Sequence, residues 1–384
     1  MKKMSILQLF DQSLDQTNLH GLRNEAKILF LAYFTRILEK PVSVLVKGPS
    51  SGGKSTLLNT VLGYFPKETR HEYNGFSEKA IIHSDKIYKN KVLAIHEYAG
   101  VSGNNGNVLL RQLLSENHIT YEYTHPAPDG SFTTKVKSKE GPTALFMTTT
   151  DKAIFDEDEN RMVSLNIPND PEYNRSALIE ISKSMNGRNT ERIDYANWHQ
   201  LSHEFDQINK QFFIPFLEQL AHKVNVSEAR VKRDFAKAAS LIGVNALLNR
   251  KDREENNNCI IADERDYFEV FELFSSINKA DIDGGLSHQL ASVIRCVSNW
   301  ELYLQKNFMD ITPNQLRGLS YAEIASKLEI SPTTAYNLCK KAQELGYIKN
   351  IQPNGVTSEY ELLKRIEPVG NFLPKPEVLF SKNC

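Results

Sequence analysis

Residues 42–58, VSVLVKGPSSGGKSTLL, leave few choices for the fold of this chain. They join an apolar run typical of a buried strand, a glycine-rich loop and the start of a helix. Within them, residues 48–55 fit G-x-x-x-x-G-K-[ST] at every fixed position, which is the pattern of a phosphate-binding loop. The alternative, a glycine- and serine-rich turn that happens to precede a helix, is disfavoured by this flanking context. The stretch therefore predicts an α/β domain that binds a nucleoside triphosphate.

The loop residues have the chemistry that a phosphate site needs. Its glycines are expected to take backbone angles closed to other residues, so that successive N–H groups turn inward at a helix N-terminus. Lys54 would reach the β- and γ-phosphates, and the Ser55 hydroxyl would be a ligand of Mg²⁺. The residues expected to bind the nucleotide here are Gly48, Pro49, Ser50, Ser51, Gly52, Gly53, Lys54, Ser55 and Thr56.

Composition excludes several classes of protein. The 384 residues exceed one compact core and indicate two or three domains, and the net charge of -1 provides no bulk field for nucleic acid. The cysteines are far apart and form no C-x-x-C pair, which argues against a zinc knuckle or a disulfide framework and favours the reducing cytoplasm. No signal peptide and no apolar run of about 18 residues is found, so we expect no membrane partner. The four cysteines are Cys259, Cys296, Cys339 and Cys384.

A carboxylate ends the next strongly apolar run. Residues 92–97 read VLAIHE, which puts Glu97 at the carboxyl end of a predicted strand beside the phosphate loop. An acid there can hold the Mg²⁺ shell or orient the attacking water, so Glu97 is the expected catalytic acid and, with Ser55, a metal ligand. Asp is commonest at the preceding position, but here it is His96, which either shifts metal coordination to Ser55 and water or alters the role of the acid. An ordinary strand ending in an exposed glutamate is the alternative.

Residues 119–139 predict a hairpin, because two β-prone runs flank a turn rich in Pro, Asp and Gly at 125–130. Its second arm carries Lys135, Lys137 and Lys139 at a period of two, so all three project from one face. Two interpretations stand: a solvated edge that resists aggregation, or an element that grips DNA.

Two further features lie after the hairpin. The strand predicted at 143–150, TALFMTTT, ends in threonines where a γ-phosphate sensor would lie. Arg161 precedes another predicted strand at 162–167 and suits a finger that stabilises charge on the phosphate of a neighbouring subunit. It could instead pair with the acidic residues at 156–159.

The last organised segment predicts a helix, a turn, a second helix and a hairpin between residues 320 and 363. Ser331 is the expected cap of the second helix, Pro332 its first residue and Gly346 its stop. Such an arrangement binds DNA with the second helix in the major groove, although similar modules also dock proteins. The side chains expected to face bases or phosphates are those of Thr333, Thr334, Tyr336, Asn337, Lys340 and Lys341.

Taken together, these pieces resemble the AAA+ ATPases of the minichromosome maintenance (MCM) type, and more closely the helicase-like ATPases of phages, plasmids and genomic islands. The resemblance covers residues 19–363 and rests on GPSSGGKS, LAIHE, the lysine-bearing hairpin before TALFMTT, ENRMVSL and the helix ARVKRDFAKAASLIGVNALL. It implies an α/β fold, with an AAA+ P-loop ATPase core, a helical lid and a C-terminal winged helix-turn-helix domain. The expected segments are an N-terminal helical segment (1–40), the core (41–168), the lid and connecting helices (169–308), the winged-helix domain (309–368) and a loose tail (369–384).

The resemblance also implies roles for single residues. Lys135 and Lys137 would contact DNA in a central channel, and Arg161 would be the arginine finger. Arg233 would be the second sensor, with Arg230 as the other candidate. The first sensor is usually Asn in the family, and here Thr148 or Thr149 stands in that place, so Thr148 joins the expected nucleotide-binding residues.

The expected function is that of an ATP-dependent DNA translocase or helicase. The resemblance implies a homo-oligomeric ring, commonly a hexamer, with ATP and Mg²⁺ bound between neighbours and single-stranded or forked DNA as partner. Replication of a mobile genetic element is the expected setting. The alternative is an ATPase switch whose winged helix binds DNA or a protein, in regulation or phage defence.

Overall fold

The chain forms two compact units. The first comprises Met1–Ile277 together with Asn371–Cys384, and the second comprises Asn278–Gly370. The second, called the inserted unit below, therefore interrupts the sequence of the first. The computed structural model describes residues 3–17, 19, 21–77, 80–97, 101–102, 104–126, 131–150, 159–169, 171–186, 193–226, 230–280, 288–307, 318–353, 355–366 and 372–381.

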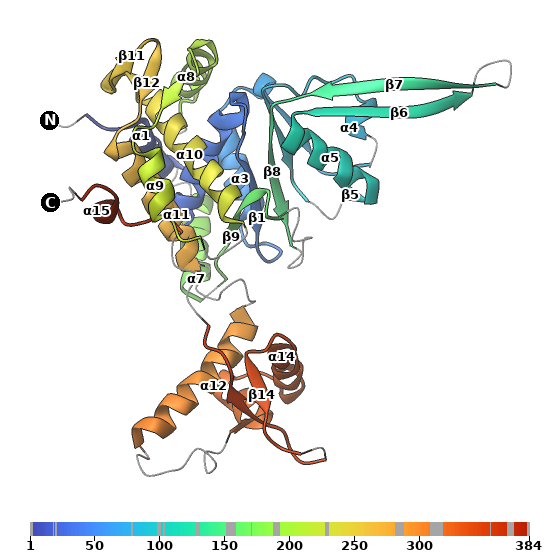
Figure 1. The fold of residues 1–384 in the computed structure, drawn as a ribbon, viewed down its shortest axis with the longest axis vertical. Coiled ribbons are helices and arrows are strands. Elements are labelled where there is room, and N and C mark those ends of the chain that lie inside the picture. Colours follow the sequence, from blue (N-terminus) through green and yellow to red (C-terminus); the bar gives the residue numbers. More distant parts are fainter. Residues whose placement is uncertain are drawn as a thin grey trace. The chain divides into compact units, whose positions relative to one another are not determined.

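A five-stranded parallel sheet lies at the centre of the first unit (Figure 1). Its order is β2-β4-β8-β1-β9, so β8 lies between β1 and β4 although it follows both in the chain. Because the strands are parallel, their carboxyl ends meet at one edge of the sheet. This arrangement confirms the predicted α/β class. The strands are β1 (Ser43–Lys47), β2 (Arg70–Tyr73), β4 (Lys91–Ile95), β8 (Thr143–Thr149) and β9 (Met162–Asn166).

Helices cover both faces of this sheet. Side chains alternate along a strand, so Val44 and Val46 enter one apolar core and Leu45 enters the other. The second core is closed by α4 (Ala80–His83) and α5 (Asn104–Glu116). The first core is larger and is shared by α1 (Ile6–Ser13), α2 (Arg23–Phe34), α3 (Lys54–Gly63), α8 (Ala196–Gln207), α9 (Leu217–Lys223), α10 (Val231–Leu248) and α11 (Glu264–Ala280).

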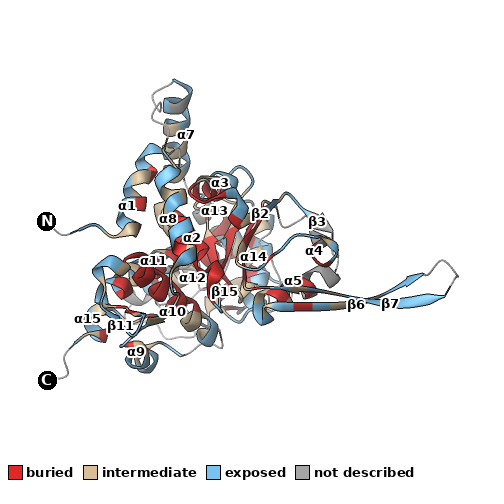
Figure 2. Ribbon diagram, turned by 90° about the horizontal axis from the view of Figure 1, so that it is seen from above, coloured by how far each residue is buried: buried red, intermediate tan, exposed pale blue. Residues whose placement is uncertain are grey.

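Smaller elements complete the first unit. The strands β6 (His118–Pro126) and β7 (Phe132–Glu140) form the predicted hairpin, which extends away from the sheet and is largely exposed (Figures 1 and 2). Among the described residues, no helix is both long enough and apolar enough to cross a membrane. The other elements are β3 (Phe76–Ser77), β5 (Val101–Ser102), α7 (Pro171–Met185), β10 (Phe212–Phe213), β11 (Glu255–Asn256), β12 (Cys259–Ile261), α15 (Pro376–Leu379) and the 3₁₀ turns η1 (Leu14–Gln16), η2 (Thr35–Ile37), η3 (Lys67–Thr69) and η5 (Arg250–Asp252).

The end of the chain packs on the first unit. Leu373 and Leu379 are buried in its larger core, and the Tyr267 hydroxyl donates a hydrogen bond of 2.6 Å to the Pro374 carbonyl. The expectation of a loose tail after residue 369 is therefore wrong for residues 372–381. The prolines and charged residues of this segment are typical of a loose tail, and two leucines alone gave no pattern that predicts packing.

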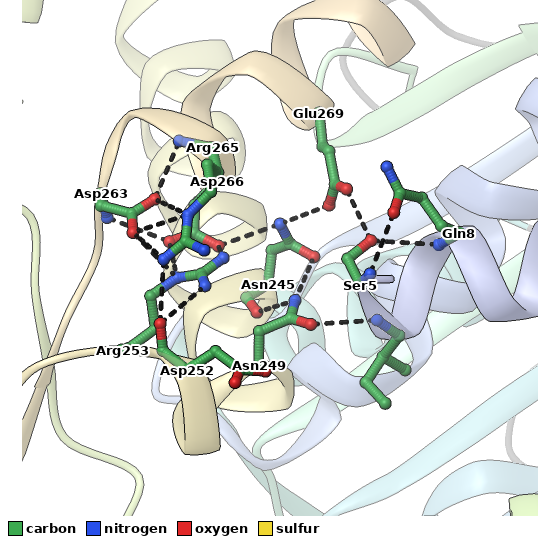
Figure 3. Close-up of polar contacts among 11 residues, drawn as sticks. Ser5, Gln8, Asn245, Asn249, Asp252, Arg253, Asp263, Arg265, Asp266 and Glu269 are labelled. Atoms are coloured by element: carbon green, nitrogen blue, oxygen red, sulfur yellow. Dashed lines mark hydrogen bonds and ion pairs between the residues drawn. The ribbon is translucent and has the colours of Figure 1, made fainter. Parts of the chain in front are cut away.

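A buried polar cluster ties the N-terminal helix to α10 and α11 (Figure 3). Ser5 donates a 2.6 Å hydrogen bond to Glu269, which also accepts one of 2.8 Å from Asn245. Arg253 grips the Asp266 carboxylate through two nitrogens, at 2.8 and 2.7 Å. The Asp266 side chain is fully buried, and this burial raises its pKa although Arg253 opposes the shift.

Replacing Arg253 with methionine is expected to destabilise the first unit by about 3–5 kcal/mol, because it leaves the buried Asp266 carboxylate without its cation. Unfolding in urea measures the loss. The matched control is Arg265→Ala, since Arg265 is half exposed and pairs at the surface with Asp263; about 0–1 kcal/mol is expected. The Asp266 pKa is raised in the folded state and rises further in the variant, so the stability deficit should shrink as the pH falls and protonates Asp266. A deficit that is small at neutral pH would contradict this prediction.

The inserted unit contains the predicted helix pair and hairpin. The Ser320 hydroxyl and Glu323 form a reciprocal capping box at the start of α13, and the Ser331 hydroxyl accepts the Thr334 N–H at the start of α14. Pro332 is the first residue of α14, as predicted. Gly346 lies just after the end of α14 and has a positive φ of 74°. The elements are α12 (His288–Asn307), β13 (Leu319–Ser320), α13 (Tyr321–Leu328), α14 (Pro332–Glu344), β14 (Ile348–Asn350) and β15 (Glu359–Leu362), with sheet order β13-β15-β14.

Helix α12 belongs to the inserted unit, although the sequence placed it among the connecting helices. Val293, Ile294 and Val297 are fully buried and share a core with Ile324 of α13 and Cys339 of α14. The residues between 308 and 317, where the winged-helix domain was expected to begin, lie outside the described residues.

Candidate nucleotide site

The phosphate-loop sequence connects β1 to α3 at the carboxyl edge of the sheet. Gly53 is the N-cap of α3 and has a φ of 95°, which a residue with a Cβ rarely adopts. The use of angles closed to other residues, expected of the loop glycines, is found at Gly53 and not at Gly48 or Gly52, whose φ is not positive. Space is limited at both positions instead: a Cβ on Gly48 would lie 2.8 Å from the Ile167 Cβ, which forces a shift, and one on Gly52 would lie 3.0 Å from the Pro49 carbonyl oxygen, which is a tight contact.

Lys54 is the first residue of α3, and its side chain folds back over the loop. Its ammonium donates hydrogen bonds to the carbonyls of Gly48, at 2.9 Å, and Pro49, at 2.7 Å. Burial lowers the pKa of Lys54, and the negative charge of Glu97 opposes this shift. Ser55 and Thr56 follow it on the first turn of α3 and are exposed. The cation thus already lies inside the loop, with the Ser55 side chain open beside it.

Glu97 follows β4 at the same edge of the sheet as the loop. The Thr150 hydroxyl, which follows β8, donates a 3.3 Å hydrogen bond to its carboxylate. The preceding residue, His96, points to other partners: its ring Nε2 lies 3.5 Å from the Glu72 carboxylate. A site that includes Lys54 and Glu97 is therefore assembled from the ends of β1, β4 and β8.

The threonines at the end of β8 have different partners. Thr148 is fully buried, and its hydroxyl donates to the His96 carbonyl, so it joins the ends of β8 and β4. The carbonyl of Thr149, also buried, accepts the Gly48 N–H at 3.3 Å. Thr150 is one of the terminal threonines expected at the sensor position, although the resemblance pointed to Thr148 or Thr149, and it is the threonine whose hydroxyl donates to Glu97. The period of two along β8 puts Thr148 and Thr150 on one side, which was the available signal.

Arg161 lies at the amino end of the sheet, opposite the end that carries the phosphate loop. It immediately precedes β9, which pairs in parallel with β1 so that Met162 is level with Ser43 and Asn166 with Lys47. The phosphate loop begins only after Lys47, so the length of β1, roughly 13 Å at 3.3 Å per residue, separates the two positions. Arg161 donates a hydrogen bond to the Ser115 hydroxyl in α5. The structure therefore does not bring Arg161 to the phosphate loop of its own chain.

The acidic residues proposed as alternative partners of Arg161 are divided by the described region. Residues 156–158 lie outside it. Glu159 is described, and its carboxylate meets the Lys47 ammonium at 2.5 Å and the Ser164 hydroxyl at 2.8 Å. Glu159 thus has other partners than Arg161 in the contacts described.

Helix α10 holds the backbone on both sides of Arg161. The buried ammonium of Lys237 donates to the carbonyls of Asn160, at 3.1 Å, and Met162, at 2.8 Å. It also lies 3.0 Å from the Asp234 carboxylate. Burial lowers the pKa of Lys237, and Asp234 opposes the shift. The sequence analysis gave Lys237 no site role and assigned the second sensor to arginines at the start of the same helix instead.

The two sensor candidates on α10 are placed differently. Arg230 pairs with Asp234 at 2.7 Å, four residues further along the helix. Arg233 is exposed. These observations place neither arginine at the phosphate loop of the same chain.

His, Cys, Asp and Glu side chains form no metal-binding cluster of three or more among the described residues.

The hairpin lysines share one face, as predicted, but two of them are engaged at its base. The register pairs Lys135 with Tyr123 and Lys137 with Tyr121, which puts these tyrosines on the lysine face. Lys137 donates to the His83 carbonyl at 3.4 Å, and Lys139 donates to the Lys86 carbonyl at 3.1 Å. Lys135 is exposed, and its ammonium has no hydrogen bond or ion pair within the described residues. Lys135 and the neighbouring Tyr123 therefore form the accessible part of this face.

The helix α14 exposes most of the side chains expected to read DNA. Thr333, Asn337 and Lys340 are exposed, as are Tyr336 and Lys341. Thr334 is half-buried, and its hydroxyl lies 2.7 Å from that of Ser331 at the helix cap. Thr334 is therefore engaged at the helix cap, and the other five candidates are exposed.

No protein-family model matches the chain, and no curated protein matches it. Solved structures similar to it include a full-length MCM homologue from Methanopyrus kandleri, with 13% identity, a TM-score of 0.41, and 70% of this chain and 57% of that chain covered. The helicase Cch of SCCmec type IV shares 11% identity, with a TM-score of 0.33 and coverage of 88% and 67%. The C-terminal region of NrS-1 shares 12%, with a TM-score of 0.29 and coverage of 94% and 76%. This chain spans less than two thirds of the MCM homologue, and at these scores the likeness defines no activity.

Proposed function

We propose that this chain is an ATP-driven DNA translocase or helicase that works as a ring of identical subunits. One observation carries the proposal: Lys54 and Glu97 both lie at the carboxyl end of the sheet, where the charge of Glu97 acts on Lys54, whereas Arg161 lies at the amino end. An arginine finger in that position can act only on the nucleotide of a neighbouring copy. Each site would then need two subunits.

The loop residues fit a nucleotide with Mg²⁺. Gly48 and Gly52 lie where a side chain would be crowded, and Gly53 provides the left-handed angle at the helix N-terminus, so phosphate oxygens could meet backbone N–H groups. Lys54 would exchange its carbonyl partners for phosphate oxygens. Ser55 and Glu97 would hold Mg²⁺, which supplies positive charge to the phosphates when bound.

The hydrolytic step would use residues of this chain in separate roles. Glu97 would accept a hydrogen bond from the attacking water and so orient it, while the Thr150 hydroxyl fixes the carboxylate. Lys54 would stabilise the charge that develops on the phosphates. Thr148 would act by joining β8 to β4, and Arg233 would approach the nucleotide of a neighbouring copy.

An exposed apolar stripe supports self-association. Leu178, Ile181 and Met185 follow one another at helical spacing on α7, and their exposed fractions are 64%, 54% and 83%. Large exposed apolar patches commonly mark interfaces between proteins. We infer that α7 contributes to the contact between subunits, in a ring that is a hexamer by the resemblance.

Two surfaces would bind DNA. Lys135 and Tyr123 on the hairpin combine a cation with an aromatic ring, which suits the backbone and bases of a single strand. The pair α13–α14 with β14 and β15 would act as a winged helix, with Thr333, Asn337 and Lys340 toward the groove. Replication of a mobile genetic element in the cytoplasm is the setting that the sequence resemblance favours.

Replacing Lys135 with alanine is expected to weaken single-strand binding and to lower the stimulation of ATP hydrolysis by DNA. Since one phosphate contact is lost, the slope of log K against log salt should fall by about 0.7. Fluorescence anisotropy of a labelled oligonucleotide across a salt series measures both. Lys89→Ala is the matched control, because Lys89 is also an exposed lysine but pairs with Glu140 at the hairpin base.

The opposite outcome would change the proposal. If ATP turnover is indifferent to single- and double-stranded DNA at low salt, the translocase is ruled out. A footprint at one defined sequence, without strand displacement, would then favour the ATPase switch.

A further inference from the structure

The inserted unit carries a groove that takes no part in the proposed nucleotide and DNA contacts. One side is a stripe of α12 whose members recur at helical spacing, and the other is the end of α13. Its volume is about 730 Å³, within the range of about 300–1,000 Å³ for ligand pockets. The lining residues are Ser292, Arg295, Cys296, Asn299, Trp300, Tyr303, Lys327 and Leu328.

The groove combines stacked aromatic rings with positive charge. The rings of Trp300 and Tyr303 lie 5.6 Å apart between centroids and are inclined by 18°. The Lys327 ammonium lies 5.6 Å from the centre of the Trp300 ring. Arg295 adds a second cation, and no acidic side chain is among the described residues that line the groove. This chemistry favours a ligand that is both planar and anionic.

Packing holds the aromatic stripe in place. The opposite side of α12 contributes Leu290, Val293, Ile294 and Val297 to the core of the inserted unit, and all four are buried. The groove therefore lies on a helix that is fixed by its other face. None of the described lining residues belongs to α14, so the groove is distinct from the surface expected to read duplex DNA.

We propose that this groove binds a segment of single-stranded nucleic acid. A base stacks on the aromatic pair of Trp300 and Tyr303, and the adjoining phosphates lie near Lys327 and Arg295. An acidic peptide would satisfy the cations but would provide no planar group for the rings. This proposal rests on the proposed function in that nucleic acid is the substrate, and it adds a second single-strand contact, made by the inserted unit and not by the hairpin.

The chain provides its own optical probe for this contact. It has two tryptophans, Trp198 and Trp300. Trp198 packs against Phe10 and Phe30 in the first unit, and Trp198→Phe leaves Trp300 as the single indole. In that full-length background, without ATP, oligothymidylate is expected to quench the Trp300 fluorescence, because stacking brings a base against the ring.

Two variants test which groups bind. Tyr303→Ala is expected to raise the oligonucleotide concentration needed for half-maximal quenching about tenfold, since stacking on one aromatic side chain is removed. Lys327→Ala should reduce the salt slope of the quenching titration by about 0.7. Lys364→Ala is the matched control, because its ammonium also lies over an aromatic ring, that of Tyr347 at 5.9 Å, but outside the groove. It should leave the titration unchanged.

Anisotropy of the labelled oligonucleotide, recorded in the same samples, separates this proposal from the proposed function. Binding that depends on Lys135 without any change in Trp300 fluorescence overturns the groove alone. No binding at all overturns both. Equal quenching by an abasic strand of the same length shows an anion site without base stacking and also overturns the proposal. Quenching that needs bases and weakens in the Tyr303 and Lys327 variants supports it.

Discussion

Replacing Lys54 with alanine should lower ATP hydrolysis by at least about 100-fold, because removing one preorganised charge donor at the reacting phosphates costs about 10²–10³ in kcat. Lys54 begins α3, and its ammonium already lies within the loop, 2.9 and 2.7 Å from two loop carbonyls. Release of inorganic phosphate from ATP by the full chain measures the effect. ATP binding should also weaken, which a fluorescent nucleotide reports.

The control for this change is Lys67→Ala. Lys67 is an exposed lysine of the 3₁₀ turn η3, after the helix that Lys54 begins, and its loss should leave hydrolysis unchanged. The thermal midpoint of both variants shows whether the fold survives, since Lys54 also bridges the loop. A folded Lys54→Ala protein that hydrolyses ATP at the normal rate would remove the phosphate loop from the mechanism.

Replacing Arg161 with alanine is expected to lower kcat by about 10³-fold or more, the range given by arginine fingers in phosphoryl transfer. Arg161 lies before β9, at the end of the sheet away from Lys54, so on the proposed function the loss would occur in a neighbour's site. ATP binding to the isolated variant should therefore change little, which separates Arg161 from Lys54. Arg161→Lys should recover only part of the rate, because an ammonium lacks the planar fork of a guanidinium.

Mixing the two inactive variants gives the sharper test. Subunits with Lys54→Ala still provide Arg161, and subunits with Arg161→Ala still provide a complete loop. A mixture should therefore regain activity at those interfaces where the two complement each other, and the gain should follow the mixing ratio. Mixing each variant with itself is the control. If no ratio restores hydrolysis while both variants assemble, the finger does not act between subunits.

Local signals made much of this fold predictable. The strand, glycine loop and helix around the phosphate-loop pattern, the cap at Ser331 with Pro332 after it, and the buried strand β8 depend on residues close in sequence, and the structure has each of them. The lysine row on β7 was likewise predictable because a strand repeats every two residues. These features follow from backbone geometry that neighbouring residues determine.

Contacts between distant segments could not be predicted in this way. The Lys237 ammonium donates to the carbonyls on both sides of Arg161, about 75 residues away in the sequence. The residues near either segment do not predict that the two segments are in contact. The engagement of Lys137 with the His83 carbonyl similarly removes a cation that the pattern alone left available. The hydrogen bond from Thr150 to Glu97 depends on the order of strands in the sheet. It forms because β8 lies beside β4, between β4 and β1, although it follows both in the chain.

The return of the chain to the first unit after the inserted unit has a mechanical consequence. Because Leu373 and Leu379 are buried in the larger core, the inserted unit is attached at both of its ends. A unit joined at both ends has fewer independent movements than a unit joined at one end. Removing residues 372–381 would free one end and also open the core that the two leucines fill. On the proposed function, a force that DNA exerts on the inserted unit would therefore pass to the first unit through both connections.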